Sequence, residues 1–217
     1  MSRFLPQIAH LLLRKEWISL KQSLDLEYKH YLTGDDNSVS PFFSRLLISG
    51  EDHRYFGHNG IDLIAICRVL WRRLAWGVCE GASTIEMQTV RILTGRYERT
   101  FRRKIKEMLL ATLVTHVIPK EELPAVYLRI AYFGWRMNSL NQACRRLDLN
   151  SSFLTSYEAA VLIARLKYPE PRQAPFSRRR QISRRAQHLI KLYQRHSEQG
   201  VYELLDGGGV YAALHNI

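Results

Sequence analysis

Cysteine is scarce in this sequence. Its 217 residues include three cysteines, Cys67, Cys79 and Cys144, and none of them forms a CxxC pair. An odd count at such spacings predicts neither a disulfide framework nor a zinc site. No other set of side chains stands out as metal ligands, so we predict no metal-binding residues.

Long apolar runs are missing as well. The apolar pieces near the N-terminus end at Arg14 and Lys15. They are far shorter than the roughly 20 residues that a membrane-spanning helix needs, and they lack the layout of a cleavable signal peptide. An amphipathic helix that rests on a membrane surface through Leu11 to Leu13 and Trp17 is compatible with the pattern.

Acidic residues are the minority among the charged residues. The chain has 20 Asp and Glu against 32 Lys and Arg, which gives a formal net charge of +12. The basic residues gather at 72–73, 99–106, 145–146 and 178–185. Such clusters favour a polyanionic partner. Nucleic acid, anionic lipid headgroups and a pyrophosphate-bearing substrate all qualify, so charge alone does not separate them.

Alternating strand patterns are rare, and apolar residues mostly recur three and four positions apart. The fold class is therefore predicted to be mainly α. Helices are expected at 7–32, 61–76, 101–117, 123–133, 155–166 and 178–196. Together with a turn at 34–37 and a glycine-rich end, this pattern predicts an N-terminal helical segment at 1–40, a main domain at 41–196 and a C-terminal tail at 197–217.

The helix at 101–117 is expected to present one apolar stripe beside charged faces. The stripe comprises Phe101, Ile105, Met108, Leu109, Leu113 and His116. Arg103 and Lys104 lie four and three positions before Glu107, so one face of this helix carries all three charges. Taken alone, this group is most simply a solvated ion pair worth about 0.3–0.5 kcal/mol.

An acidic pair, Glu51 and Asp52, follows the apolar run at 46–48 and precedes an aromatic residue, a histidine and a glycine turn. A carboxylate at the point where a buried segment reaches the surface is well placed to act as a base. A helix end with an acidic cap is the structural alternative.

Five blocks of sequence together carry more information than any one of them. They are Glu51-Asp52-x-x-Tyr55-x-x-His58-x-Gly60-x-Asp62, Gly81-Ala82-Ser83-Thr84-Ile85-Glu86-Met87-Gln88, Arg103-Lys104-Ile105-Lys106-Glu107, Lys120 followed by Tyr127-Leu128 and Tyr132-Phe133-Gly134, and Arg184-Arg185 with Leu189. In order and spacing these blocks resemble the peptidoglycan glycosyltransferases of family 51. That family comprises the transglycosylase domain of bifunctional penicillin-binding proteins and its monofunctional relatives.

The resemblance implies a lysozyme-like helical domain with a small membrane-facing lobe, and an enzyme that polymerises lipid II into glycan strands. In that reaction the 4-hydroxyl of the acceptor attacks the anomeric carbon of the donor with inversion, and undecaprenyl pyrophosphate leaves. The hydroxyl needs a base, and the leaving group needs positive charge. By resemblance, Glu51 is the catalytic base and Glu107 is the second catalytic glutamate.

The resemblance also assigns the substrate-binding residues, which are Asp52, Ser83, Gln88, Arg91, Arg99, Arg103, Lys104, Lys106 and Lys120. Arg91 stands where the family usually has lysine; arginine keeps the charge and adds a planar fork that suits phosphate oxygens. A divalent cation such as Mg²⁺, acting with Glu107, is the one cofactor that the resemblance allows for.

Several positions depart from the family pattern. Glu86 and Met87 replace Thr and Gln, while Ala125 and Arg129 replace Glu and Asn. A negative charge at Glu86 would repel a pyrophosphate unless it is paired, and we expect a neighbouring arginine to be its partner.

The implied partners are lipid II, the growing glycan strand, the membrane surface and cell-wall synthesis proteins, at the outer, periplasmic face of the cytoplasmic membrane. Three alternatives stay open. They are a degenerate relative that binds lipid-pyrophosphate sugars without turnover, a basic nucleic-acid-binding protein, and a lysozyme-type hydrolase. Arginines suited to pyrophosphate weigh against the hydrolase. The lack of a recognisable nucleic-acid-binding motif weighs against the second, so nucleic acid is not expected as a partner.

Overall fold

The computed structural model describes residues 4–34, 39–78, 81–150, 154–202 and 205. Its elements are α1 (Phe4–Leu12), α2 (Arg14–Thr33), α3 (Pro41–Glu51), the 3₁₀ turn η1 (Tyr55–Gly57), α4 (Leu63–Trp76), α5 (Ile85–Thr94), α6 (Phe101–Val114), α7 (Leu123–Ile130), α8 (Leu140–Arg146), α9 (Ser156–Lys167) and α10 (Phe176–Glu198). Within the described residues, extended pairing is confined to isolated β-bridges. The prediction of a mainly α fold is confirmed. Most of the predicted turn at 34–37 and most of the tail lie outside the described residues.

Contacts divide the chain into two compact units. The first unit comprises Met1–Glu27 and Arg54–Lys120, and the second comprises Tyr28–His53 and Glu121–Ile217. The chain crosses between the units three times, within α2, after His53 and after Lys120. The predicted boundaries at 40 and 196 divide the chain along its sequence, whereas the two units are defined by contacts. These boundaries stay a prediction.

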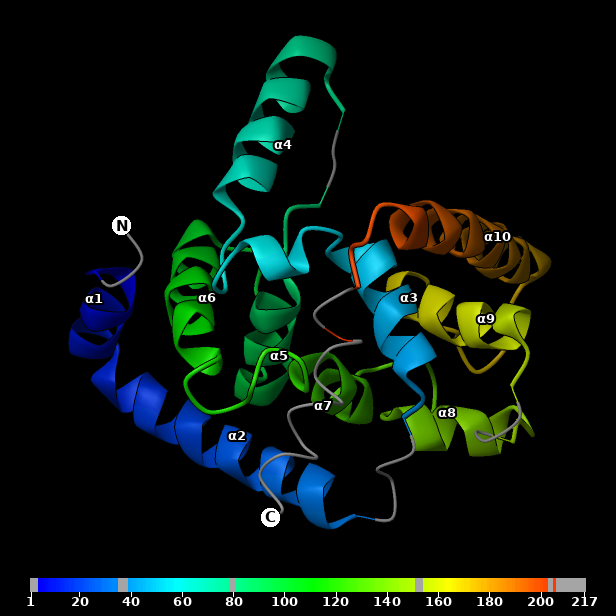
Figure 1. Ribbon diagram of the computed structural model, residues 1–217, viewed down its shortest axis with the longest axis horizontal. Helices are drawn as coiled ribbons and strands as arrows, with labels where there is room; N and C mark the ends of the chain where they lie inside the picture. The colour runs from blue at the N-terminus through cyan, green and yellow to red at the C-terminus, as the bar shows by residue number, and fades with distance from the viewer. Residues whose placement is uncertain (1–3, 35–38, 79–80, 151–153, 203–204, 206–217) are drawn as a thin grey trace. The chain divides into compact units, whose positions relative to one another are not determined.

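In the first unit, α6 packs against α5 and α1. The helix α4 extends away from α5 and α6 (Figure 1), and Ala65 is its one buried residue. Its bounds follow local chemistry. Asp62 caps the N-terminus because its Oδ1 accepts a hydrogen bond of 3.0 Å from the amide of Ala65. Gly77 ends the helix in the left-handed conformation, with φ of 64°.

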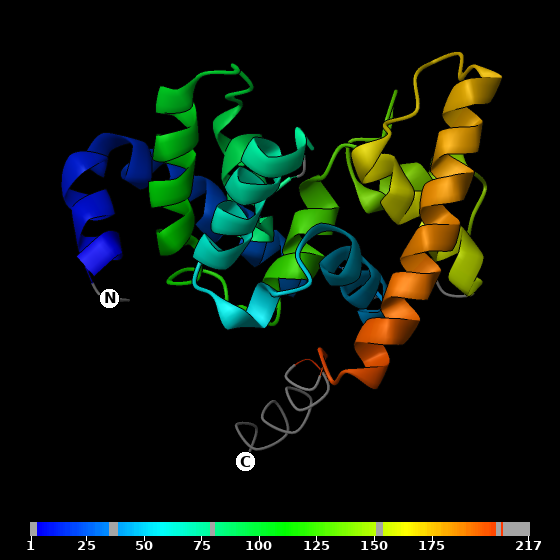
Figure 2. The same cartoon turned by 90° about the horizontal axis from the view of Figure 1, so that it is seen from above.

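In the second unit, α10 runs beside α9 in both views (Figures 1 and 2) and also packs on α3. The contact with α3 is close at Gly50, where an added Cβ would lie 2.4 Å from a methyl group of Leu189. Further toward the C-terminal end of α10, His196 Nδ1 lies 3.0 Å from the hydroxyl of Ser49. These contacts fix the end of α3 that carries Glu51.

Several helices differ from the sequence prediction. The helix expected at 101–117 ends at Val114. The expected helix at 7–32 is two helices that meet at Leu13. The helix expected to end at Phe133 ends at Ile130, because Ala131 is extended with ψ of 147°. The short helix α8 was not predicted; Ser139 caps it by accepting a 3.1 Å hydrogen bond from the amide of Gln142.

The predicted apolar stripe of α6 was wrong in part. Phe101 and Ile105 are 81% and 41% exposed, whereas the buried side of the helix includes Glu107, Leu110 and Ala111. The buried face of α6 therefore includes the charged Glu107, and it excludes the predicted apolar residues Phe101 and Ile105. Such burial is tolerable only where the charge is paired.

Candidate active site

A buried carboxylate with three cationic partners lies at the contact between α5 and α6. The side chain of Glu107 is 3% exposed. Arg91 on α5 donates two hydrogen bonds to it, of 3.0 Å from Nε to Oε2 and 2.8 Å from Nη2 to Oε1. Lys104 Nζ lies 2.9 Å from Oε1, and Arg103 Nη1 donates to Oε2. We call Glu107, Arg91, Arg103 and Lys104 the Glu107 cluster.

The charges of the Glu107 cluster do not cancel. One carboxylate faces three cations, so the group carries a net charge of about +2 at neutral pH. Burial alone would raise the pKa of Glu107, but hydrogen bonds from Arg91 and Lys104 and their positive charge hold it below its usual value. Burial also lowers the pKa of Lys104, against the opposing pull of Glu107. The geometry supports an ionised Glu107 that holds three cations in place.

The loop before α5 adds a hydroxyl to this cluster. Lys104 Nζ donates to Ser83 Oγ over 2.9 Å. The next residue, Thr84, accepts a hydrogen bond from the amide of Met87 over 3.2 Å and donates one of 2.8 Å to the carbonyl of Gly60. Gly60 has a φ of 85°, and an added Cβ would lie 2.3 Å from the carbonyl oxygen of Ala111. The loop is therefore held by a hydrogen bond to α5 and, through Gly60, by close packing against Ala111 of α6.

Three further predicted substrate-binding residues of the first unit are not part of the Glu107 cluster. Lys106 pairs with Glu16 over 2.6 Å. Arg99 is exposed in the segment that precedes α6, and Gln88 is half-buried on α5. The Glu107 cluster thus gathers three predicted substrate-binding residues, Arg91, Arg103 and Lys104, around the predicted catalytic Glu107. Ser83 adjoins it through Lys104.

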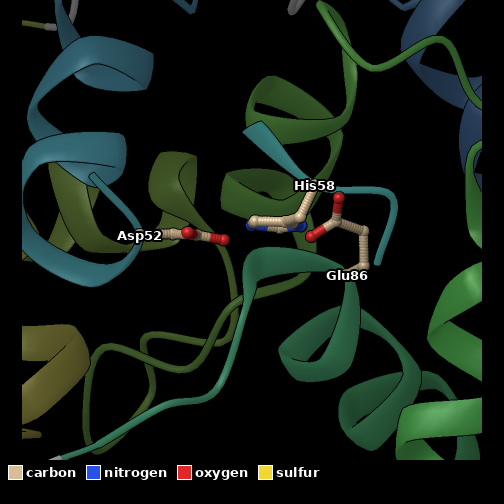
Figure 3. A group of neighbouring side chains, drawn as sticks. All are labelled: Asp52, His58 and Glu86. Carbon is tan, nitrogen blue, oxygen red and sulfur yellow. The ribbon is translucent and has the colours of Figure 1, made fainter. Parts of the chain in front are cut away.

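Lys120 has a buried acidic partner. Its ammonium lies 2.9 Å from Oε1 of Glu86, whose side chain is 0% exposed. The same ammonium donates to the carbonyl of His58 and lies 4.4 Å from the ring centroid of Tyr55. Figure 3 shows the Glu86 carboxylate beside the His58 imidazole. The expectation that Glu86 is paired is confirmed, but its partner is a lysine and not a neighbouring arginine.

The second unit holds the predicted base. Glu51 is the last residue of α3, and Asp52 caps the helix and is 8% exposed. Arg185 on α10 donates to the carbonyl of Gly50 over 2.6 Å and lies 3.4 Å from Oε1 of Glu51. Arg185 is thus a counter-ion of the predicted base. It was not among the predicted site residues, although the Arg184-Arg185 block was a signal for it.

Comparison with known proteins decides the family. The sequence matches the family described as Transglycosylase over residues 20–194. The chain belongs to the transglycosylase family. The resemblance drawn from the five sequence blocks is confirmed.

Three relatives are 29%, 32% and 34% identical to the chain over the aligned residues alone. It is 32% identical to penicillin-binding protein 1A of Escherichia coli (strain K12) over 151 residues, which are 69% of this chain and 18% of that protein. It is 29% identical to a monofunctional glycosyltransferase of Staphylococcus aureus (strain JH9) over 165 residues, which are 70% of the chain and 61% of that protein. Penicillin-binding protein 1F of Bacillus subtilis (strain 168) is 34% identical over 136 residues, which are 61% of the chain and 19% of that protein. The chain thus spans under two thirds of each of these transglycosylase relatives.

The surroundings of Glu107 do not fit a divalent cation. Both carboxylate oxygens already accept hydrogen bonds from cationic groups. A Mg²⁺ ion would have to displace them and would lie among three positive charges, whereas it usually binds through one or two free carboxylates. No chemical step is therefore assigned to a metal held by Glu107.

The buried pair of Glu86 and Lys120 gives a testable stability difference. The change Glu86→Gln keeps an oxygen that accepts from Lys120, removes the charge and replaces the other carboxylate oxygen with an amide nitrogen. We expect a loss of about 1–3 kcal/mol in unfolding free energy, because the ammonium then lacks its counter-ion. Urea denaturation followed by circular dichroism measures it.

A matched control is Glu16→Gln, which neutralises the partner of Lys106 in the same unit. The side chains of that pair are 26% and 24% exposed, so we expect a loss below about 1 kcal/mol. Equal unfolding free energies for the two variants would contradict a structural role for the buried charge of Glu86.

Proposed function

We propose that the chain is a peptidoglycan glycosyltransferase that polymerises lipid II by inverting transfer. The observation that carries this proposal is the Glu107 cluster, whose net positive charge suits a departing pyrophosphate. Family membership adds the reaction class, because relatives carry the names glycosyltransferase and penicillin-binding protein.

The reaction needs one proton acceptor and one site for the leaving group. We assign the first role to Glu51, whose carboxylate takes the proton of the acceptor 4-hydroxyl as its oxygen bonds to the anomeric carbon. The bond between that carbon and the pyrophosphate oxygen breaks, and the electron pair leaves with the pyrophosphate. Arg91, Arg103 and Lys104 then stabilise the negative charge of the leaving group.

The remaining predicted residues have supporting parts in this proposal. Ser83 holds Lys104 in position, and Arg99 and Gln88 offer a cation and an amide to the donor. Asp52 orients the end of α3 beside Glu51. Lys120 and Lys106 act through their ion pairs with Glu86 and Glu16. A divalent cation stays a prediction, and it is checked by assaying with Mg²⁺ and then with EDTA.

Polymerisation of labelled lipid II in detergent tests the proposed function. We expect the full chain to form glycan strands longer than the disaccharide of the substrate. Saturable lipid II binding without any product, under conditions in which an established family member is active, would indicate a degenerate binding protein in place of an enzyme.

A lipid-linked substrate requires contact with a membrane, and α4 offers a suitable surface. No helix in the described part of the chain is long and apolar enough to cross a bilayer. Exposed on α4, however, are Leu70, Trp71, Leu74 and Trp76, with Arg68 and Arg73 alongside. Apolar and aromatic side chains with basic neighbours are typical of helices that lie in the membrane interface.

On α1 of the same unit, Leu11 and Leu12 are exposed and add to the apolar surface, whereas Leu13 and Trp17 are buried in the protein and do not. We propose that α4 and α1 rest on the outer face of the cytoplasmic membrane, where cell-wall synthesis proteins would be further partners.

Substitution at the most exposed leucine of α4 tests the membrane contact. Leu74 is 85% exposed, so Leu74→Asp should leave folding intact. We expect binding to phosphatidylglycerol vesicles to weaken roughly tenfold, since burying a leucine contributes about 1.5–3 kcal/mol. Phe176→Asp on α10, at a residue 80% exposed, is the control, and vesicle sedimentation is the measurement. An equal loss in both variants would contradict a role for α4.

A further inference from the structure

An indole in the second unit is held by a tight turn. The amide of Trp135 donates to the carbonyl of Glu170 over 2.8 Å, and the amide of Phe133 donates to the carbonyl of Met137 over 2.8 Å. Gly134 has a φ of 143°, and an added Cβ would lie 2.3 Å from the carbonyl oxygen of Glu170. The close approach requires glycine at that position, and it fixes the backbone that presents Trp135.

Three arginines from three segments gather on this indole. The guanidinium carbons of Arg136, in the turn, and of Arg146, at the end of α8, each lie 4.5 Å from the ring centroid of Trp135. The guanidinium carbon of Arg172, in the segment between α9 and α10, lies 5.3 Å from it. A cation within about 6 Å of an indole face is attracted by the ring. One ring therefore collects three positive charges.

In the described part of the chain, these three charges have no acidic partner. Within the described residues, no carboxylate lies within ion-pair distance of Arg136, Arg146 or Arg172, and their guanidinium groups make no hydrogen bond to the protein. Of the acids that are nearest in sequence, Glu170 is held by Arg165 over 2.8 Å, and Asp148, two residues after Arg146, forms no ion pair with any of the three arginines. Like charges on one ring repel each other, and each guanidinium has five N–H donors. All three arginines are exposed, so water accepts their hydrogen bonds in the free protein, and an anion with several acceptor oxygens would also offset their charge.

The backbone of Arg136 also favours a ligand-binding interpretation. Arg136 has a φ of 58°, a conformation that is unusual for residues other than glycine and asparagine. Strained conformations of this kind cluster at ligand-binding positions. The turn thus places the arginine over Trp135 at a conformational cost.

We propose that Trp135, Arg136, Arg146 and Arg172 form a binding site for a phosphate-class oxyanion. A phosphate or pyrophosphate group carries more than one negative charge and accepts hydrogen bonds on several oxygens, which suits planar guanidinium forks. A lone carboxylate would neutralise one charge of three. None of the four residues has a part in the proposed transfer reaction, so the test of this site is independent of the test of that reaction.

Tryptophan emission reports on the site, because the arginines lie against Trp135. The full chain is titrated with sodium phosphate and pyrophosphate at ionic strength held constant with sodium chloride. We expect a saturable change that is absent in Trp135→Phe, which assigns the signal among the four tryptophans of the chain. Arg146→Gln and Arg172→Gln should each weaken the apparent affinity about tenfold. Arg172→Lys, which keeps the charge without the fork, should weaken it also.

The matched control is Arg180→Gln, which removes the same charge from an exposed position of α10 in the same unit. It should leave the affinity unchanged, and circular dichroism establishes that each variant is folded. An equal weakening in Arg180→Gln would show general charge screening and overturn the site.

A second set of titrations distinguishes a free oxyanion from the phosphate of a lipid headgroup. Phosphatidylglycerol vesicles are compared with phosphatidylcholine vesicles, and the titration of Trp135→Phe is subtracted to remove the signals of the other tryptophans. A response to free pyrophosphate supports a soluble oxyanion. A response to phosphatidylglycerol vesicles alone, with the same dependence on Arg146 and Arg172, supports a lipid headgroup. A single-stranded DNA oligonucleotide is titrated in parallel. The proposal would be overturned by no saturable response to pyrophosphate or vesicles, or by a response to the oligonucleotide alone.

Discussion

Replacing Glu51 with glutamine is expected to lower kcat for glycan polymerisation by roughly 10²–10⁴-fold, the usual contribution of a positioned general base. Glutamine has the same length and still offers an oxygen to Arg185, which lies 3.4 Å from Oε1 of Glu51. Its amide does not accept the proton of the acceptor hydroxyl. The KM for lipid II should change little, because Glu51 acts on the reacting hydroxyl and not on the pyrophosphate. Steady-state kinetics with labelled lipid II separate the two parameters.

The control for this variant is Glu198→Gln, the same chemical change at an exposed residue of α10 in the same unit. It should retain wild-type kcat. Retention of activity in Glu51→Gln would remove Glu51 from the role of base. A parallel loss of lipid II binding would instead assign it to substrate binding.

The sequence predicted those parts of the fold that depend on local chemistry. The helix expected at 61–76 matches α4 at its end and begins two residues before it, because Asp62 is the cap and not a helical residue. Left-handed Gly77 ends the helix, and both effects act within one turn. The helix α8 escaped prediction because its seven residues are too short for a clear apolar period. The break at Leu13 within the expected helix at 7–32 was not predicted either, since the apolar spacing continues across it.

In the candidate site, too, contacts within one helix could be predicted from the sequence, and contacts between helices could not. Arg103 and Lys104 could be placed on one face with Glu107, since residues three and four apart are neighbours on a helix. The two hydrogen bonds from Arg91 depend on how α5 packs against α6. Likewise, Lys120 is 34 positions from Glu86 in the sequence, and only tertiary packing makes them partners. The predicted stripe of α6 was wrong at Phe101 for a related reason, because compensated charge can replace apolar surface at a helix contact.

Neutralising Glu107 is expected to reduce both stability and catalysis. In Glu107→Gln, Arg91, Arg103 and Lys104 lose their shared counter-ion and repel one another. Removing one partner of a buried ion pair costs about 3–5 kcal/mol, and we expect the lower end because the three cations keep partial access to water. At neutral pH this corresponds to a fall of about 6–12 °C in Tm. Thermal unfolding followed by circular dichroism measures it, and Glu98→Gln at an exposed residue of the same unit is the control.

The pH dependence of this difference distinguishes loss of charge from loss of packing. The pKa of Glu107 in the folded chain lies below its usual value of 4.5. A lowered pKa contributes stability that is present above the unfolded value and is lost as pH falls through the folded value. The Tm of the wild type should therefore fall toward that of Glu107→Gln as the pH drops below about 4.5, the ordinary value for a glutamate. A gap in Tm that stays constant between neutral and acidic pH would mean that Glu107 stabilises the protein by shape and not by charge. That result would contradict the proposal that the Glu107 cluster binds pyrophosphate through its charge.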